Sequence, residues 1–198
     1  MRQRKIKYVS KKLLDDLGII TYFKELKVSE NTYLELGSGK GKFITDLANY
    51  YKDNNYIAVE KSMDASYRIY EKKLDLNLSN LTIVNLDVKD LQEFIKSKTI
   101  SGIYLNFSDP WPKKKHHKRR LTNPNFLKTY NDLLKDQGFI QFRTDHKDFF
   151  LESLIDLEEN FETIKIDYDL KPSEFMTEYE IKKRDNGPIY EYLGVKKC

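Results

Sequence analysis

The 198-residue chain is long enough for one globular domain with a sizeable core, and its aromatic content of 13% argues against disorder, because a disordered chain buries too little apolar surface. Its formal net charge is only +4, no apolar run approaches the roughly 18 residues of a membrane span, and the basic amino terminus lacks the apolar stretch of a secretory signal. The one cysteine, Cys198, excludes an internal disulfide, so we expect a cytoplasmic protein without membrane association.

Short apolar runs alternate with helical patterns from residue 32 onward. The apolar runs predict strands over residues 33–36, 56–60, 81–87, 102–107 and 139–143. Between and after them, apolar residues recur with helical spacing and predict helices over residues 43–51, 62–76, 89–97, 124–138 and 149–157. Repeated strand–helix units of this kind place helices on both faces of a doubly wound, mostly parallel α/β sheet.

The last part of the chain follows a different pattern. Residues 161–166 and 189–195 have the pattern of two strands joined by a long loop without an obvious helix, which predicts an antiparallel pair that closes one edge of the sheet. No internal repeat or linker divides the chain. We therefore expect a basic, partly flexible extension over residues 1–29 and a single domain over residues 30–198.

Acidic residues lie at or just past the ends of five successive predicted strands. They are Glu35, Glu60, Asp87, Asp109 and Asp145. A single acid at a strand end is usually a turn or helix-cap residue. Because ligands in such sheets bind outside the carboxyl ends of the strands, five acids at one edge instead favour a binding site.

The first strand leads into a glycine loop that contains Gly37, Gly39 and Gly41. With a strand before it, a helix after it and Glu60 at the next strand end, this loop fits a cofactor whose ribose hydroxyls Glu60 would bind. A dinucleotide and S-adenosylmethionine both remain possible. The GxGxG spacing differs from the dinucleotide pattern GxGxxG, and the carboxylates would repel a pyrophosphate but suit a sulfonium cation and an α-amino group. Electrostatics therefore favour S-adenosylmethionine.

Basic residues concentrate in two segments. Residues 1–12 and 113–120 each hold six Lys or Arg and no acid, whereas the rest of the chain holds more acids than bases. This distribution indicates a protein that binds a polyanion. Pro110 and Pro112, which precede the second segment, stiffen the strand exit and direct the cations outward. The two adjacent histidines of that segment lack further His or Cys ligands nearby, so we assign no metal.

Four motifs, in chain order, make the sequence resemble the bacterial tRNA (guanine-N7-)-methyltransferases over about residues 30–195. They are GSGKG after the first strand, DPWPKKKHHKRR after the fourth, RTDH after the fifth, and TEYE at residues 177–180. The resemblance implies a class I S-adenosylmethionine-dependent methyltransferase with a Rossmann-like seven-stranded sheet and a reversed final hairpin. It also implies methyl transfer to N7 of the guanine at position 46, in the variable loop of tRNA.

The resemblance also implies a role for each residue that matches a family motif. Cofactor contacts are implied for Glu35, Gly37, Gly39, Gly41, Glu60, Asp87 and Asp109, and Asp109 is also implied as the acidic residue of the catalytic site. Substrate contacts are implied for Lys113, Asp145, Thr177, Glu178, Tyr179 and Glu180. RNA contacts are implied for Lys115, His116, His117, Lys118, Arg119 and Arg120. Lys115 stands where the family more often has arginine, so this contact would lack a bidentate fork.

Two other functions are compatible with parts of the sequence. A class I methyltransferase for another RNA, a protein or a small molecule would share the fold, but a protein or small-molecule substrate leaves the basic segment after Asp109 without a use. A non-catalytic RNA-binding module would explain the basic segments, but its carboxylates would repel RNA unless a cationic cofactor lay among them. We therefore expect a tRNA methyltransferase that acts as a monomer or a homodimer.

Overall fold

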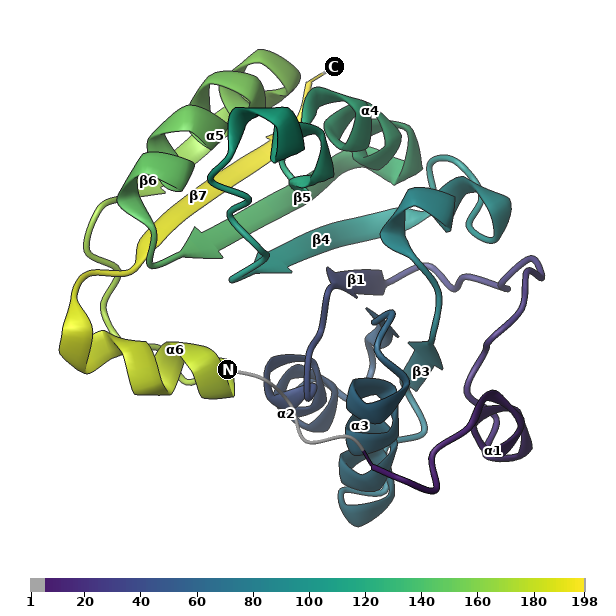
Figure 1. Ribbon diagram of the computed structural model, residues 1–198. Coiled ribbons are helices and arrows are strands. Elements are labelled where there is room, and N and C mark those ends of the chain that lie inside the picture. Colours follow the sequence, from purple (N-terminus) through teal and green to yellow (C-terminus); the bar gives the residue numbers. More distant parts are fainter. Residues whose placement is uncertain (1–5, 198) are drawn as a thin grey trace.

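The computed structural model describes residues 6–197, in which seven strands form a sheet with the order β3-β2-β1-β4-β5-β7-β6 (Figure 1). Neighbouring strands among β1 to β5 pair in parallel, and β7 pairs antiparallel with both β5 and β6. The strands are β1 Thr32–Leu36, β2 Asn55–Val59, β3 Leu81–Val84, β4 Ile100–Asn106, β5 Leu134–Thr144, β6 Phe161–Asp167 and β7 Tyr190–Lys196. The predicted doubly wound, mostly parallel sheet with an antiparallel hairpin at one edge is confirmed.

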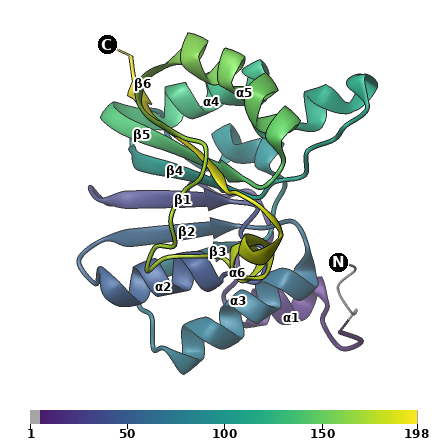
Figure 2. The same ribbon diagram turned by 90° about the vertical axis from the view of Figure 1, so that its left-hand side faces the viewer.

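Helices cover both faces of this sheet (Figure 2). One face carries α1 Lys11–Asp16, α2 Lys42–Tyr50 and α3 Met63–Asp75. The other carries the 3-10 helix η1 Val88–Glu93 together with α4 Pro124–Leu133 and α5 Lys147–Asn160. The remaining short helices are η2 Lys114–Arg119, α6 Glu178–Lys183 and η3 Arg184–Asn186. None of the helices within the described residues is both long enough and apolar enough to cross a membrane.

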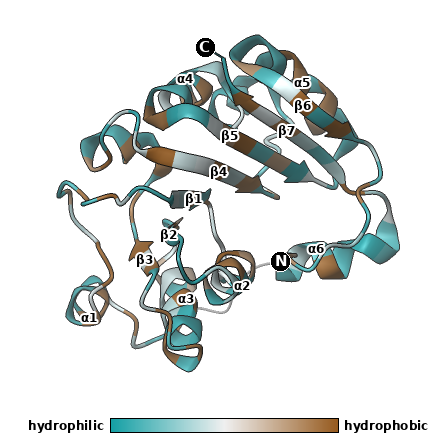
Figure 3. Ribbon diagram, turned by 180° about the vertical axis from the view of Figure 1, so that it is seen from behind, coloured by the Kyte–Doolittle hydropathy of each residue, from teal (hydrophilic) through white to brown (hydrophobic). Residues whose placement is uncertain are grey.

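The central strands such as β2 and β4 are largely apolar on both sides, because helices cover both faces of the sheet there. In β4, Ile103 and Leu105 pack toward α4 and α5, whereas Tyr104 between them packs toward α2. Alternation with a period of two is what a pleated strand requires, and burial on both faces is typical of parallel sheets. The helices show hydrophobic and hydrophilic residues side by side (Figure 3), as expected where one side of a helix faces the sheet and the other faces solvent.

Two expectations about local structure were wrong. The helix that starts at Pro124 ends at Leu133 instead of continuing to about residue 138, because the backbone becomes extended at Leu134 and enters β5. The connection between β6 and β7 contains α6, although its sequence shows no clear helical pattern. Thr177 caps this six-residue helix by accepting a hydrogen bond from the backbone N–H of Glu180 at 2.9 Å, and tertiary contacts described below hold it in place.

The described part of the predicted extension, residues 6–29, packs against the sheet. Ile20 forms a parallel bridge with Val84 of the edge strand β3, and Leu14, Ile19 and Leu26 are buried. Residues 1–5, with their basic side chains, and Cys198 lie outside the described residues. The domain boundary at residue 30 stays a prediction.

Candidate active site

Two adjoining cavities lie at the edge where the parallel strands end. The first, of about 660 Å³, lies beyond β2 and β3 and is called the β2–β3 cavity; among the residues that line it are Glu60, Asp87, Asp109, Trp111, Lys118 and Arg119. The second, of about 520 Å³, is called the α6 cavity; among the residues that line it are Glu35, Lys40, Asn106, Thr177, Glu178 and Lys182. Gly37 and Phe107 line both. The expected convergence at this edge is therefore present for acids from β1, β2, β3 and β4.

The glycine loop connects the two cavities and has a backbone that favours glycine. Gly37, Gly39 and Gly41 all have positive φ angles, of 75°, 55° and 80°. At Gly41, which starts α2, an added Cβ would also lie 2.7 Å from the Ile69 side chain of α3. Gly41 thus lets α2 and α3 approach each other, whereas Gly37 and Gly39 line the α6 cavity. A cofactor contact by Gly41 stays a prediction.

Glu60 at the end of β2 is bound to the glycine loop. Its Oε2 accepts a hydrogen bond from the N–H of Gly39 at 2.9 Å, and its Oε1 accepts one from the N–H of Ser62 at 2.8 Å. Burial raises the pKa of this carboxyl, and the two backbone donors oppose that rise. Each carboxylate oxygen retains a second lone pair, so hydroxyl groups of a ligand in the β2–β3 cavity still have acceptors here.

Glu35 is the most buried acid of this edge. Its side chain is 1% exposed, and its Oε1 accepts a hydrogen bond from Asn106 Nδ2 at 2.9 Å. Its Oε2 has no hydrogen-bond partner within the described residues, although the residue lines the α6 cavity. Burial raises the pKa of Glu35 to about 8. Because an unpartnered buried acceptor is costly, this oxygen is suited to a cationic donor group of a ligand.

Asp87 and Asp109 complete the acidic lining of the β2–β3 cavity. Asp87 caps η1, with its Oδ1 accepting from the N–H of Lys89 at 3.1 Å. Asp109 is exposed and has no ion pair with another side chain in residues 6–197. Lys61 and Lys89 line the same cavity, so the acids are interspersed with cations that sequence reasoning did not place there.

Asp145 and Tyr179, which are far apart in the sequence, meet beside the α6 cavity. Tyr179 Oη donates a hydrogen bond to Asp145 Oδ2 at 3.2 Å, and Lys183 Nζ lies 3.7 Å from the same oxygen. The Tyr179 ring also contacts the Phe107 ring, with centroids 5.2 Å apart. Tyr179 lines the α6 cavity, whereas Asp145, the fifth acid expected at this edge, contacts Tyr179 but lines neither cavity. Lys113 is exposed just before η2 and lines neither cavity.

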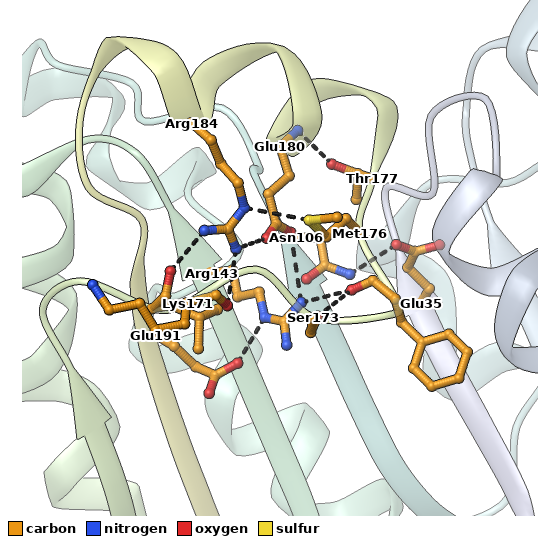
Figure 4. A network of polar contacts seen from close by, with 12 residues as sticks. Glu35, Asn106, Arg143, Lys171, Ser173, Met176, Thr177, Glu180, Arg184 and Glu191 are labelled. Carbon is orange, nitrogen blue, oxygen red and sulfur yellow. Dashed lines mark hydrogen bonds and ion pairs between the residues drawn. The ribbon is translucent and has the colours of Figure 1, made fainter.

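A buried ion-pair network holds the TEYE segment in place (Figure 4). We call Arg143, Glu180, Arg184 and Glu191 the Arg143 network. Arg143 Nε lies 2.6 Å from Glu191 Oε2, Arg143 Nη1 lies 3.5 Å from Glu180 Oε2, and Arg184 pairs with the other oxygen of Glu180. Two cations and two anions therefore balance each other in a site that water barely reaches.

The same network also ties down the backbone of the β6–β7 connection. Arg143 Nη1 donates to the carbonyl of Phe175 at 3.1 Å, and Arg184 Nη1 donates to the carbonyl of Leu170 at 2.7 Å. Glu180, expected as a substrate contact, is 0% exposed and lines neither cavity. Sequence reasoning missed Arg143 and Arg184. For Arg143 the available signal was a charged residue in an otherwise apolar strand pattern, whereas Arg184 follows α6 and had no comparable signal.

The basic segment folds as the 3-10 helix η2, and most of it faces solvent. Lys113, Lys114, Lys115, Lys118 and Arg119 are exposed, while His116 and His117 are half-buried. Arg119 lies over the Trp111 ring, 5.0 Å from its centroid, and His116 contacts the same ring edge-on. Two residues flanking Asp109, Phe107 and Trp111, have left-handed backbones with φ of 52° and 41°, which is strained for bulky side chains.

Arg120 differs from the rest of the basic segment. Its side chain is buried, its Nε donates to the carbonyl of Pro110 at 2.7 Å, and its guanidinium pairs with Glu152 of α5. It also lies over the Phe149 ring at 5.0 Å. These contacts fasten the proline-containing turn to α5. Within residues 6–197, no group of three or more His, Cys, Asp or Glu side chains is arranged to hold a metal ion.

The sequence and the fold of this chain are similar to those of known proteins. A family model described as "Putative methyltransferase" matches residues 29–192. A tRNA (guanine-N(7)-)-methyltransferase of Exiguobacterium sibiricum is 39% identical over 172 residues, which are 84% of this chain and 81% of that protein. One of Alkaliphilus metalliredigens is 46% identical over 160 residues, 76% and 74% of the two chains. A solved S-adenosylmethionine-dependent methyltransferase from Aquifex aeolicus has a similar fold, with a TM-score of 0.62, 13% identity, and coverage of 94% of this chain and 89% of that chain.

Arg143→Met should strongly destabilise the protein, because it leaves the carboxylates of Glu180 and Glu191 buried with less charge to balance them. We expect the free energy of unfolding, measured by urea denaturation, to fall by about 3–5 kcal/mol. Lys165→Met is the matched control, since Lys165 Nζ lies 3.4 Å from Glu191 but is about half exposed; it should cost no more than about 1 kcal/mol. Equal losses in the two variants would contradict a stabilising role of the buried network.

Glu35→Gln should change the pH dependence of stability in the ligand-free protein. Burial raises the pKa of Glu35 to about 8 in the native state, above the usual pKa of 4.5 for a free glutamate. The native state thus binds more protons over this window, so the contribution of Glu35 to the free energy of unfolding falls as the pH rises from about 4.5 to 8.

Urea denaturation at several pH values tests this expectation. The stability of Glu35→Gln relative to wild type should rise by about 2–4 kcal/mol between pH 5 and pH 8. The exposed Glu174→Gln should show no such trend. A pH-independent difference between Glu35→Gln and wild type would mean that Glu35 does not change its protonation in this range.

Proposed function

This chain belongs to the tRNA (guanine-N7-)-methyltransferase family, and on that premise we propose that it transfers a methyl group from S-adenosylmethionine to N7 of the guanine at position 46 of tRNA. The observation that carries the proposal is the pair of adjoining cavities lined by Glu35, Glu60, Asp87 and Asp109, directly beside the exposed cations of η2. We propose that the protein acts in the cytoplasm, as a monomer or a homodimer.

The residues at this edge fit S-adenosylmethionine. The buried Glu35 Oε2 without a partner suits the α-amino group of the methionine part, beside the glycine loop. Glu60 at the end of β2 has lone pairs for ribose hydroxyls, and Asp87 and Asp109 line the cavity that would take the nucleoside. When bound, this cofactor supplies an electrophilic methyl group on a positively charged sulfur. A cation among these acids is favourable because they otherwise repel one another.

The chain's own residues need only position the guanine and stabilise charge. Guanine N7 carries a free lone pair at neutral pH, so no general base is required. As N7 is methylated, positive charge develops on the purine, and Asp109 and Asp145 are the anions proposed to orient the base and offset that charge. The Tyr179 hydroxyl donates to Asp145 and so fixes the direction of its carboxylate. Lys113, Thr177 and Glu178 are proposed to contact the nucleotide.

RNA is proposed to lie across η2. Lys115, Lys118 and Arg119 offer exposed cations for phosphates, with His116 and His117 between them. For Arg120 and Glu180, burial and ion pairing support a positioning role: Arg120 holds the Pro110 turn, and Glu180 holds the TEYE segment. Because N7 lies on an edge of a base in folded tRNA, we expect some local opening of the RNA.

Mass-spectrometric mapping of nucleosides tests the proposed function directly. Unmodified tRNA incubated with the protein and S-adenosylmethionine should gain one 7-methylguanosine, located at position 46, and bulk protein extract should gain no methyl groups. A methyl group on another atom or another RNA would favour the alternative of a class I methyltransferase with a different substrate. Absence of transfer together with absence of S-adenosylhomocysteine binding by calorimetry would favour a non-catalytic module.

Asp109→Asn should lower kcat by about 100-fold at saturating cofactor and tRNA, because it removes an anion proposed to stabilise the cationic purine. Asp148→Asn provides the control, since Asp148 is an exposed acid at the start of α5 that lines neither cavity. The measurement is the steady-state rate of methyl transfer at saturating S-adenosylmethionine and tRNA. A near-wild-type rate for Asp109→Asn would remove Asp109 from the catalytic step.

A further inference from the structure

Several cations surround the α6 cavity, and most of them are already paired with acids. Arg68 of α3, which lines the cavity, lies 2.6 Å from Glu71. Near it, Lys72 of α3 pairs with Glu178, and Lys183 of α6 lies 3.7 Å from Asp145. These side chains compensate local carboxylates, so their charges are largely used within the protein.

Lys40 and Lys182 are different. Both line the α6 cavity and both are exposed, and neither has a carboxylate partner within residues 6–197. Lys40 belongs to the glycine loop, between Gly39 and Gly41, and Lys182 belongs to α6. Two uncompensated cations from separate parts of the chain thus stand at the same cavity.

The positions of these two lysines are fixed by the surrounding structure. The Lys40 backbone lies between two glycines with positive φ, in a loop that is bound to Glu60. Lys182 is two residues from Glu180, whose buried carboxylate anchors α6 to the Arg143 network. On this short helix Glu180 faces inward and Lys182 faces solvent. Both charges are therefore attached to well-held backbone, although their side chains remain free to adapt.

The carboxylates that line the α6 cavity would oppose RNA binding unless nearby cations neutralised the RNA phosphates. Asp64 and Glu178 also line the α6 cavity; Lys72 pairs with Glu178, but carboxylates at this cavity still repel a phosphodiester backbone. An RNA that presents a base to this cavity must bring the adjoining phosphates to its mouth. Exposed lysines without carboxylate partners are suited to neutralise them, because a flexible ammonium binds phosphate as a point charge.

We propose that Lys40 and Lys182 bind the backbone phosphates next to the target guanosine. They form a second cationic contact, separate from η2: Lys118 and Arg119 of η2 line the β2–β3 cavity, whereas Lys40 and Lys182 line the α6 cavity. The RNA is thus held by cations at both cavities while its base enters between them. This inference rests on the proposed function, since it assumes an RNA substrate.

The salt dependence of tRNA binding tests the inference. In the double variant Lys40→Met/Lys182→Met, two lost phosphate contacts should make the slope of log Kd against log salt concentration shallower by about 1.4–1.8. The affinity for tRNA near 150 mM salt should fall about tenfold. The double variant Lys40→Arg/Lys182→Arg should keep the wild-type slope, because the charges remain.

Two controls separate phosphate binding from indirect effects. Lys128→Met removes an exposed cation of α4 that lines neither cavity, and it should leave the slope unchanged. Calorimetric titration with S-adenosylhomocysteine should give a Kd within about twofold of wild type in the double Met variant, which shows that the glycine loop is intact.

The outcomes distinguish this inference from the function on which it rests. If wild-type protein methylates tRNA but the double Met variant keeps the wild-type slope, the inference is overturned and the proposed function stands. A slope change of the same size in Lys128→Met would also overturn it, because the effect would then reflect net charge alone. If wild-type protein leaves tRNA unmethylated, the proposed function itself fails.

Discussion

The pairing of Arg143 with Glu191 is the interaction on which the candidate site depends. The two residues face each other in the antiparallel register of β5 and β7, so the reversed last strand places a carboxylate directly beside the arginine. Arg143 then reaches Glu180, which Arg184 balances from the other side. Because a buried charge without a partner is very unfavourable, these ion pairs restrict the β6–β7 connection to one position against the sheet. One wall of the α6 cavity is built in this way.

The acids at this edge are less negative in effect than their number suggests. Glu60 is bound by two backbone N–H groups, and burial raises the pKa of Glu35 to about 8, which favours the uncharged form of Glu35 near neutral pH in the ligand-free protein. Lys61 and Lys89 lie among the remaining acids. Such a site can accept a cationic ligand and still tolerate a polyanion alongside, which a methyl transfer from a sulfonium to RNA requires.

The turn after β4 has a strained backbone on both sides of Asp109. Phe107 and Trp111 both have left-handed backbones, and both line a cavity. The strain is opposed by specific bonds: the Phe107 N–H donates to the Arg143 carbonyl at 2.8 Å, and Arg120 donates to the Pro110 carbonyl at 2.7 Å. Asp109 lies between these two anchored points, so its exposed carboxylate is presented by a backbone with little freedom.

The sequence by itself determined where most strands and helices follow one another along the chain, the antiparallel end of the sheet, and the presence of acids at the ends of β1 to β4. Period-two patterns, helical patterns and glycine spacing are local properties that a sequence displays directly. The sequence also predicted that the basic segment over residues 113–120 binds a polyanion. Only the tertiary structure decided that Arg120 and Glu180 are buried, that α6 forms, and that Lys40 and Lys182 lack acidic partners. Those outcomes depend on which charges meet across the fold, and the pairing of residues far apart in the chain leaves no local pattern in the sequence.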